Sequence, residues 1–159
     1  MKAFFPGTFD PPTLGHLNII EKASKLFDQV VVAIGLDTEK APATFTIDER
    51  VFFLQSITQK LPNIQVITFS GLAIECAQDC DCIIRSVRTY ADFEHEKMLA
   101  YTNKKLSQIE TLFLLPDEPY QSISSTVIRD IGRRGHCLQK FIPKQIASAV
   151  SEKLKEAPQ

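Results

Sequence analysis

The sequence predicts an α/β protein with a doubly wound parallel sheet, and three observations support that prediction. Short apolar runs rich in β-branched residues recur along the chain, as in strands that are covered on both faces. Between these runs lie segments whose apolar residues have helical spacing. The chain has 159 residues, of which 44% are hydrophobic and 23% charged, with no internal repeat or linker. We therefore expect residues 1–159 to form one globular domain.

The first half of the chain alternates strands and helices. A short apolar strand over residues 3–5 precedes a loop and a helix whose apolar spacing begins at Leu17. A second strand is predicted over residues 29–34, followed by a polar loop. The string TIDE that begins at Thr46 is a capping box, which predicts a helix to about residue 60. A third strand and a short helix are predicted next, over residues 64–69 and 72–79.

The second half continues the same alternation. A fourth strand over residues 82–84 precedes a helix from about residue 92 to 106, and a fifth strand follows over residues 111–115. Ser124 or Ser125 caps the next helix, and a last helix is expected after Pro143, to about residue 155. Strands that alternate with helices of this length indicate a parallel sheet with helices on both faces.

Composition argues against several classes of function. A formal net charge of −1 provides no general attraction for nucleic acid or an anionic membrane. No apolar run approaches the ~20 residues of a membrane span, and Met1-Lys2 leads into a strand rather than a signal peptide. We expect a cytoplasmic protein. Cys76, Cys80 and Cys82 do not have a zinc-site spacing, so we expect buried, reduced thiols and no protein metal site.

The string PGTFDPPTLGH after the first strand has the composition of a phosphate-binding loop. In an open parallel sheet this loop lies at the carboxyl end, where ligands bind. Gly7 lets the backbone approach a ligand, Thr8 adds a hydroxyl donor, and Thr13 is a candidate helix N-cap. Gly15 and His16 then fall in the first helical turn, where free N–H groups favour an anion. The alternative is a simple turn with a solvated histidine, but the combination favours a phosphate site with His16 as a donor.

Two later groups of residues also suit phosphate. Three consecutive hydroxyls over residues 124–126 open a helix, and Arg129 follows one turn later. Arg85 and Arg88 come directly after the fourth strand, where the planar guanidinium can bind phosphate oxygens in pairs. Taken alone, each group is also compatible with an ordinary helix cap or with surface arginines.

These motifs resemble those of the nucleotidyltransferase superfamily. The string TLGH that ends at His16 is similar to the signature [H/T]-x-G-H, and ISSTVIR from Ile123 is similar to the second signature, which binds the β- and γ-phosphates. The longer string PGTFDP followed by TLGH resembles the family of bacterial phosphopantetheine adenylyltransferases. The segment RSVR followed by DFEHE also resembles that family, in which a glycine usually stands at the position of Ser86.

The resemblance implies a fold and an activity. The fold would be a Rossmann-like, five-stranded parallel sheet of order 3-2-1-4-5. The activity would be reversible transfer of AMP from ATP to 4′-phosphopantetheine, giving dephospho-coenzyme A and pyrophosphate in coenzyme A biosynthesis. Such a transfer needs no covalent enzyme intermediate and depends on positioning and charge stabilisation. The resemblance further implies Mg²⁺ bound with ATP, a homo-oligomer, expected to be a hexamer, and feedback by coenzyme A.

The resemblance also assigns residues to roles. The catalytic residues would be His16, Lys40 and Arg88. The phosphopantetheine substrate would contact Thr8, Lys40, Leu72, Ala73 and Arg85. The ATP contacts would be Thr8, Phe9, His16, Ser86, Val87, Arg88, Glu96, Tyr120, Gln121, Ser122, Ile123, Ser124, Ser125, Thr126 and Arg129.

Three alternatives stay open at this point. Within the superfamily, the acceptor would instead be nicotinate mononucleotide or glycerol phosphate. From another class, the chain would be a nucleotide-sensing module without turnover. A nucleic-acid-binding role comes third, because the charge balance opposes it.

Overall fold

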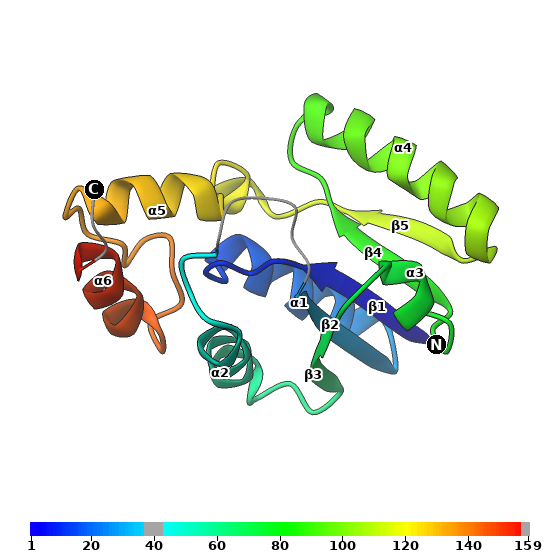
Figure 1. The fold of residues 1–159 in the computed structure, drawn as a ribbon, viewed down its shortest axis with the longest axis horizontal. Coiled ribbons are helices and arrows are strands. Elements are labelled where there is room, and N and C mark those ends of the chain that lie inside the picture. The colour runs from blue at the N-terminus through cyan, green and yellow to red at the C-terminus, as the bar shows by residue number, and fades with distance from the viewer. Residues whose placement is uncertain (37–42, 157–159) are drawn as a thin grey trace.

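The protein is an α/β sheet with helices on both faces, and the computed structural model describes residues 1–36 and 43–156 (Figure 1). The predicted fold class is confirmed. The elements in chain order are β1 (Lys2–Gly7), α1 (Leu14–Leu26), β2 (Gln29–Gly35), α2 (Ile47–Thr58), β3 (Ile64–Phe69), α3 (Ala73–Cys76), β4 (Cys82–Ser86), α4 (Tyr90–Ser107), β5 (Glu110–Leu114), the 3-10 helix η1 (Glu118–Tyr120), α5 (Ser125–Arg133) and α6 (Ala147–Glu156).

The strands are all parallel and follow the order β3-β2-β1-β4-β5, as the resemblance implied. From β1 the chain first builds outward through β2 and β3, and then returns to the other side of β1 with β4. The direction of winding therefore reverses between β1 and β4. In sheets of this kind, the loops that leave two such strands diverge and form a ligand-binding crevice at the carboxyl ends.

The alternation of side chains along β1 divides the interior into two cores. Ala3 and Phe5 point to the larger core, which α1 and α2 cover together with side chains of α5 and α6. Phe4 points to the opposite face, where Ile74 and Ala77 at α3 complete a smaller core. Both faces of the sheet are thus covered, which explains the near-continuous apolar runs of the central strands.

Helix boundaries follow their caps, and some differ from the expected ones. The Thr46 side chain accepts from the Glu49 N–H, which confirms the predicted capping box. The Thr89 hydroxyl oxygen accepts from the Asp92 N–H, so α4 begins at Tyr90, two residues earlier than expected. The expected helices over residues 72–79 and from Pro143 are shorter, because α3 ends at Cys76 and α6 begins only at Ala147.

The four cysteines are free thiols, as expected. Cys82 is buried on β4, and burial raises the pKa of its thiol. Cys76 is exposed at the end of α3, so the expectation of a buried thiol is wrong there, because Ile74 and Ala77 are the residues of this segment that pack into the core.

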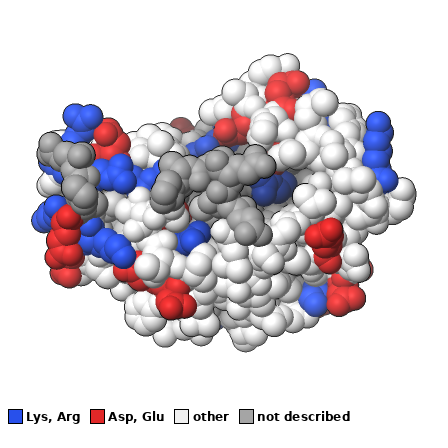
Figure 2. Space-filling model, viewed as in Figure 1, with Lys and Arg blue, Asp and Glu red and all other residues white. Residues whose placement is uncertain are grey.

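The surface carries both signs of charge. Figure 2 shows basic and acidic side chains intermixed on one face, with the basic ones gathered over the end formed by α5 and α6. Among the helices of residues 1–36 and 43–156, none is both long and apolar enough to cross a bilayer.

Candidate active site

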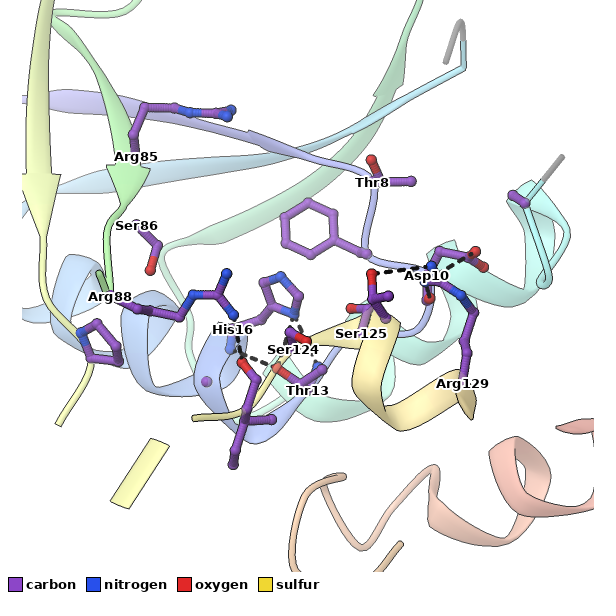
Figure 3. Close-up of a pocket in the computed structure, with 16 residues that line it drawn as sticks. Thr8, Asp10, Thr13, His16, Arg85, Ser86, Arg88, Ser124, Ser125 and Arg129 are labelled. Atoms are coloured by element: carbon purple, nitrogen blue, oxygen red, sulfur yellow. Dashed lines mark hydrogen bonds and ion pairs between the residues drawn. The ribbon is translucent and has the colours of Figure 1, made fainter. Parts of the chain in front are cut away.

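A cavity of about 360 Å³ lies at the carboxyl ends of β1 and β4, where the winding reverses (Figure 3). It brings together three segments that are far apart in the sequence: the loop after β1, the end of β4 and the start of α5. The lining residues are Thr8, Phe9, Asp10, Thr13, Gly15, His16, Ala43, Arg85, Ser86, Arg88, Pro116, Ile123, Ser124, Ser125, Thr126 and Arg129.

His16 is held by the residue that caps its own helix. The Thr13 backbone N–H donates to His16 Nδ1 over 3.1 Å, and the His16 N–H donates back to Thr13 Oγ1 over 3.2 Å. Because Nδ1 accepts a hydrogen bond from the backbone, the proton of the neutral ring belongs on Nε2. The capping box therefore fixes both the orientation and the tautomer of the imidazole.

The surroundings keep that imidazole neutral. Burial is the larger cause, and the charge of Arg88 the smaller, of a pKa lowered from 6.5 to about 4. The Phe9 ring packs edge-on against His16 with ring centroids 5.0 Å apart, and it excludes water on that side. Figure 3 shows the Arg88 guanidinium pointing toward the ring. At neutral pH, His16 is thus a hydrogen-bond donor without charge.

The two arginines of β4 and its following loop are oriented by carboxylates of α4. Arg88 Nε lies 3.1 Å from Asp92 Oδ2, and its Nη1 donates to the Ile123 carbonyl over 2.9 Å. Arg85 makes a paired contact with Glu96, of 2.6 and 2.7 Å. Glu96 does not line the cavity; its carboxylate holds the Arg85 side chain that does.

The start of α5 closes the other side of the cavity with hydroxyl groups. Ser124 caps the helix by accepting from the Val127 N–H. Ser125 Oγ donates to the Pro11 carbonyl over 2.8 Å, and Arg129 Nη1 donates to the Asp10 carbonyl over 2.6 Å. These bonds tie α5 to the loop after β1, so the free N–H groups at the helix start face the same cavity as His16.

Asp10 and Arg50 are two buried charges that the sequence patterns did not assign. Asp10 is 5% exposed and accepts from the N–H groups of Thr44 and Phe45 at 2.9 and 2.8 Å. Arg50 is 4% exposed and donates to the Thr8 carbonyl over 2.9 Å. Burial lowers the Arg50 pKa, and the charge of Asp10 opposes that shift. Nothing in the sequence marks these contacts, because the partners lie 34 to 42 residues apart.

The two glycines of the loop have different roles. A Cβ on Gly7 would lie 2.8 Å from the Phe9 ring, so this ring fills the space that the glycine leaves. The packing of Phe9 is thus a structural reason for this glycine, and Gly7 does not line the cavity, so ligand approach there stays a prediction. A Cβ on Gly15 would meet no atom closer than 3.4 Å, and Gly15 lines the cavity. A Cβ therefore fits at Gly15 without a clash, although the Tyr120 carbonyl oxygen, 3.5 Å from it, would limit a longer side chain.

Other expected site residues lie outside this cavity. Val87 is buried, and its N–H donates to the Leu114 carbonyl. Tyr120, Gln121 and Ser122 lie on the loop before α5, with Gln121 and Ser122 exposed. Leu72, next to Ala73 at the start of α3, lines a second cavity of about 510 Å³ together with Ile74, Glu75, Gln78, Leu106, Ser107 and Ile109. Lys40 lies outside the described residues.

The donor set does not form a protein cage for a metal. Within residues 1–36 and 43–156, no group of three His, Cys, Asp or Glu side chains could hold an ion. Asp10, the carboxylate of the cavity, already accepts from two backbone N–H groups. This donor set fits Mg²⁺ only where phosphate oxygens and water supply its ligands, as is usual for Mg²⁺ at nucleotide sites.

Comparison with known proteins identifies the family. Residues 4–131 match the cytidylyltransferase-like family. Proteins named phosphopantetheine adenylyltransferase are similar over nearly the whole chain. The one from Caldanaerobacter subterraneus subsp. tengcongensis is 39% identical over 158 residues, 98% of each chain. That from Desulforudis audaxviator is 42% identical over 154 residues, 95% of this chain and 94% of the relative. The one from Flavobacterium johnsoniae is 44% identical over 147 residues, 91% and 96% of the two chains. A chain that shares this sequence, this sheet order and this cavity belongs to the phosphopantetheine adenylyltransferase family of cytidylyltransferase-like nucleotidyltransferases.

Proposed function

We propose that this chain transfers AMP from ATP to 4′-phosphopantetheine, giving dephospho-coenzyme A and pyrophosphate. A phosphate oxygen of the acceptor attacks the α-phosphorus of ATP in line, and the bond from that phosphorus to the oxygen of pyrophosphate breaks. The observation that carries the proposal is the neutral His16 imidazole, held by Thr13 in a cavity that arginines line on both sides. No nucleophilic side chain is needed for this chemistry.

The start of α5 is our proposed site for the β- and γ-phosphates. The hydroxyls of Ser124, Ser125 and Thr126 and the guanidinium of Arg129 line one side of the cavity. Backbone N–H groups at a helix start and hydroxyl donors bind phosphate oxygens without requiring a high net charge. This suits a chain whose formal net charge is only −1.

His16 and Arg88 are our proposed catalytic groups at the α-phosphate. In-line transfer moves charge onto the phosphate oxygens, and donors that are already oriented stabilise that charge. Because His16 is neutral, its Nε2–H donates a hydrogen bond without a proton being transferred. The loss of one such donor raises the barrier by about 3 kcal/mol. Lys40, outside the described residues, is proposed as the third group on the family resemblance alone.

The acceptor is proposed to lie on the other side of the α-phosphate. Thr8 and Arg85 line the cavity and are our candidates for binding the phosphate of 4′-phosphopantetheine. Leu72 and Ala73 are proposed to contact the pantetheine arm. This placement rests on the family resemblance alone.

Mg²⁺ is proposed to arrive bound to ATP. When present, it neutralises charge on the phosphate oxygens and so complements the arginines. The residues described above bind and orient the phosphates themselves, and none of them is assigned to the ion.

We also propose that the chain is a cytoplasmic homo-oligomer, a hexamer by family resemblance, with coenzyme A as a feedback inhibitor. Exposed apolar side chains on α4 support an oligomer. Tyr90, Met98, Tyr101 and Leu106 are each more than 60% exposed, and none of the 18 residues of this helix is buried. Light scattering on the purified protein tests the oligomer, and a coenzyme A titration of the activity tests the feedback.

Pyrophosphate release from MgATP tests the proposed function, with 4′-phosphopantetheine and nicotinate mononucleotide as parallel acceptors. Turnover with the first alone is the expected result. Turnover with nicotinate mononucleotide alone would overturn the acceptor, and MgATP binding without turnover on either would favour a sensing module. His16→Ala is expected to lower kcat about a hundredfold or more. His136→Ala is the matched control, because His136 is exposed and does not line the cavity.

A further inference from the structure

One face of α1 holds the loop between β5 and α5. We call residues 115–123 the β5–α5 loop. Gly15, Asn18 and Lys22 are three and four residues apart on α1, so they share one face of the helix. A Cβ on Gly15 would lie 3.5 Å from the Tyr120 carbonyl oxygen. The loop therefore runs against this face of α1, close to the cavity.

Asn18 is joined to this loop by a reciprocal pair of hydrogen bonds. Its Nδ2 donates to Asp117 Oδ2 over 2.7 Å, and its Oδ1 accepts from the Asp117 N–H over 2.9 Å. Lys22 Nζ lies 2.7 Å from the other oxygen of the same carboxylate and donates to the Leu115 carbonyl. We call Asn18, Lys22 and Asp117 the α1 clasp. Asn18 is only 8% exposed, so its side-chain amide needs these partners to satisfy its hydrogen bonds.

The β5–α5 loop, fixed by the α1 clasp, positions two parts of the cavity. It ends at Ile123, whose carbonyl accepts from Arg88 Nη1 over 2.9 Å. The next residue, Ser124, is the N-cap of α5. Inside the loop, the Tyr120 N–H donates to the Asp117 carbonyl over 2.9 Å and the Ile123 N–H donates to the Tyr120 carbonyl over 3.1 Å, so two hydrogen bonds connect Asp117 to Ile123. A shift of the loop would therefore displace both the Arg88 guanidinium and the hydroxyls at the start of α5.

We propose that Asn18 is a positioning residue for ATP, which acts through Asp117 and the β5–α5 loop. This inference rests on the proposed function, because the groups that it places are those assigned to the triphosphate. Of the proposed acceptor contacts, Thr8 accepts from Arg50 and Arg85 is held by Glu96, whereas Leu72 and Ala73 lie at the start of α3. The α1 clasp is bonded to none of these residues. The clasp should thus govern affinity for ATP and leave affinity for 4′-phosphopantetheine unchanged.

An added negative charge at residue 18 tests this role, and the double variant that exchanges the residues at positions 18 and 117 tests whether the pair can be rebuilt. Asn18→Asp brings two carboxylates together at a contact that now measures 2.7 Å, and we expect the Kd and KM for MgATP to rise about tenfold. The KM for 4′-phosphopantetheine should not change. The double variant Asn18→Asp/Asp117→Asn exchanges donor and acceptor and rebuilds the reciprocal pair. It should bind MgATP within about threefold of the wild-type protein.

Asn63→Asp is the matched control, because Asn63 anchors the other end of α1. Its Nδ2 donates to the carbonyls of Ser24 and Phe27 over 2.8 and 2.9 Å. Asn63 precedes β3, so it lies at the amino ends of the strands, away from the cavity. The same substitution there should lower the melting temperature and leave the Kd for MgATP unchanged.

The outcomes separate this inference from the proposed function. An unchanged Kd in Asn18→Asp, or no recovery in the double variant, would overturn the role of Asn18. If Asn18→Asp does not fold, Asp117→Ala at a half-exposed side chain replaces it, and an unchanged Kd there would overturn the role equally. Absence of MgATP binding by the wild-type protein would overturn both proposals. MgATP binding that weakens in Asn18→Asp, without pyrophosphate release, would retain the clasp and overturn only the reaction.

Discussion

His16 should not titrate in the range where histidines usually do. Its pKa is lowered from 6.5 to about 4 by burial and by Arg88. A lowering of this size means that the folded protein disfavours the protonated ring by about 3 kcal/mol, relative to the unfolded chain. At pH 7, only about 0.1% of the folded molecules would carry charge on His16. The free protein thus enters the reaction with a neutral donor at this position.

The same shift makes stability depend on pH in a defined direction. His16 binds a proton in the unfolded chain below about pH 6.5, but in the folded protein only below about pH 4. The unfolded state binds more protons between these values, so stability rises with pH across this window and falls as the pH is lowered. From pH 7 to pH 5, the contribution of His16 amounts to a loss of about 2 kcal/mol.

Two measurements test this expectation. The ring resonances of His16, assigned by comparison with His16→Gln, should stay constant from pH 5.5 to 8 in nucleotide-free protein. Urea unfolding at pH 7 and pH 5 should show a larger loss of stability for the wild-type protein than for His16→Gln, by about 2 kcal/mol. The comparison with the variant cancels the titration of carboxylates. A midpoint between pH 6 and 7, or equal losses in both proteins, would refute the assignment of a neutral imidazole.

Four further substitutions follow from the packing and from the hydrogen bonds of Asp10. Gly15→Ala should fold with little change in stability, because the new Cβ would meet no atom closer than 3.4 Å, and should raise the KM for ATP about tenfold, because Gly15 lines the cavity proposed for the phosphates. Gly7→Ala should lose stability, because its Cβ would lie 2.8 Å from the Phe9 ring. Equal behaviour of the two variants would contradict this distinction. Gly132→Ala should destabilise the protein by about 1–3 kcal/mol in urea unfolding, because the new Cβ would lie 2.5 Å from Leu154 Cδ1. A gain in stability, the usual effect of Gly→Ala within a helix, would refute this packing. Asp10→Asn should cost about 1–3 kcal/mol of unfolding free energy, since it replaces one of two acceptor oxygens with an NH2 group and leaves the N–H of Thr44 or Phe45 without its acceptor. Unchanged urea unfolding would show that this bond contributes nothing.

Much of the fold could be predicted because its signals are local. The apolar runs mark all five strands, and the candidate N-cap Thr13 and the capping box at Thr46 begin α1 and α2 where the structure has them. Boundaries were less predictable where no cap or breaker stands in the sequence. The end of α3 at Cys76 depends on packing that a helical spacing of cysteines does not report.

The candidate site was predictable in its composition and not in its contacts. The glycines, the hydroxyls and the two arginines are visible as motifs, and the cavity brings many of them together. Glu96 was assigned to ATP through its motif, but its carboxylate pairs with Arg85. A motif states which residues are present, while the partner of each side chain depends on which elements pack beside it.

The sequence by itself determined the alternation of strands and helices, the caps of α1 and α2, and the three segments whose composition predicts phosphate binding. Each of these depends on residues within one or two turns of one another. The tertiary structure alone decided the rest. It filled the space beside Gly7 with the Phe9 ring and placed the β5–α5 loop against the face of α1 that carries Gly15. It placed Asp117 against Asn18 across 99 residues and buried Arg50 behind Thr8. Such pairings arise only when the sheet order brings distant segments together, since burial and partner are properties of the packed chain.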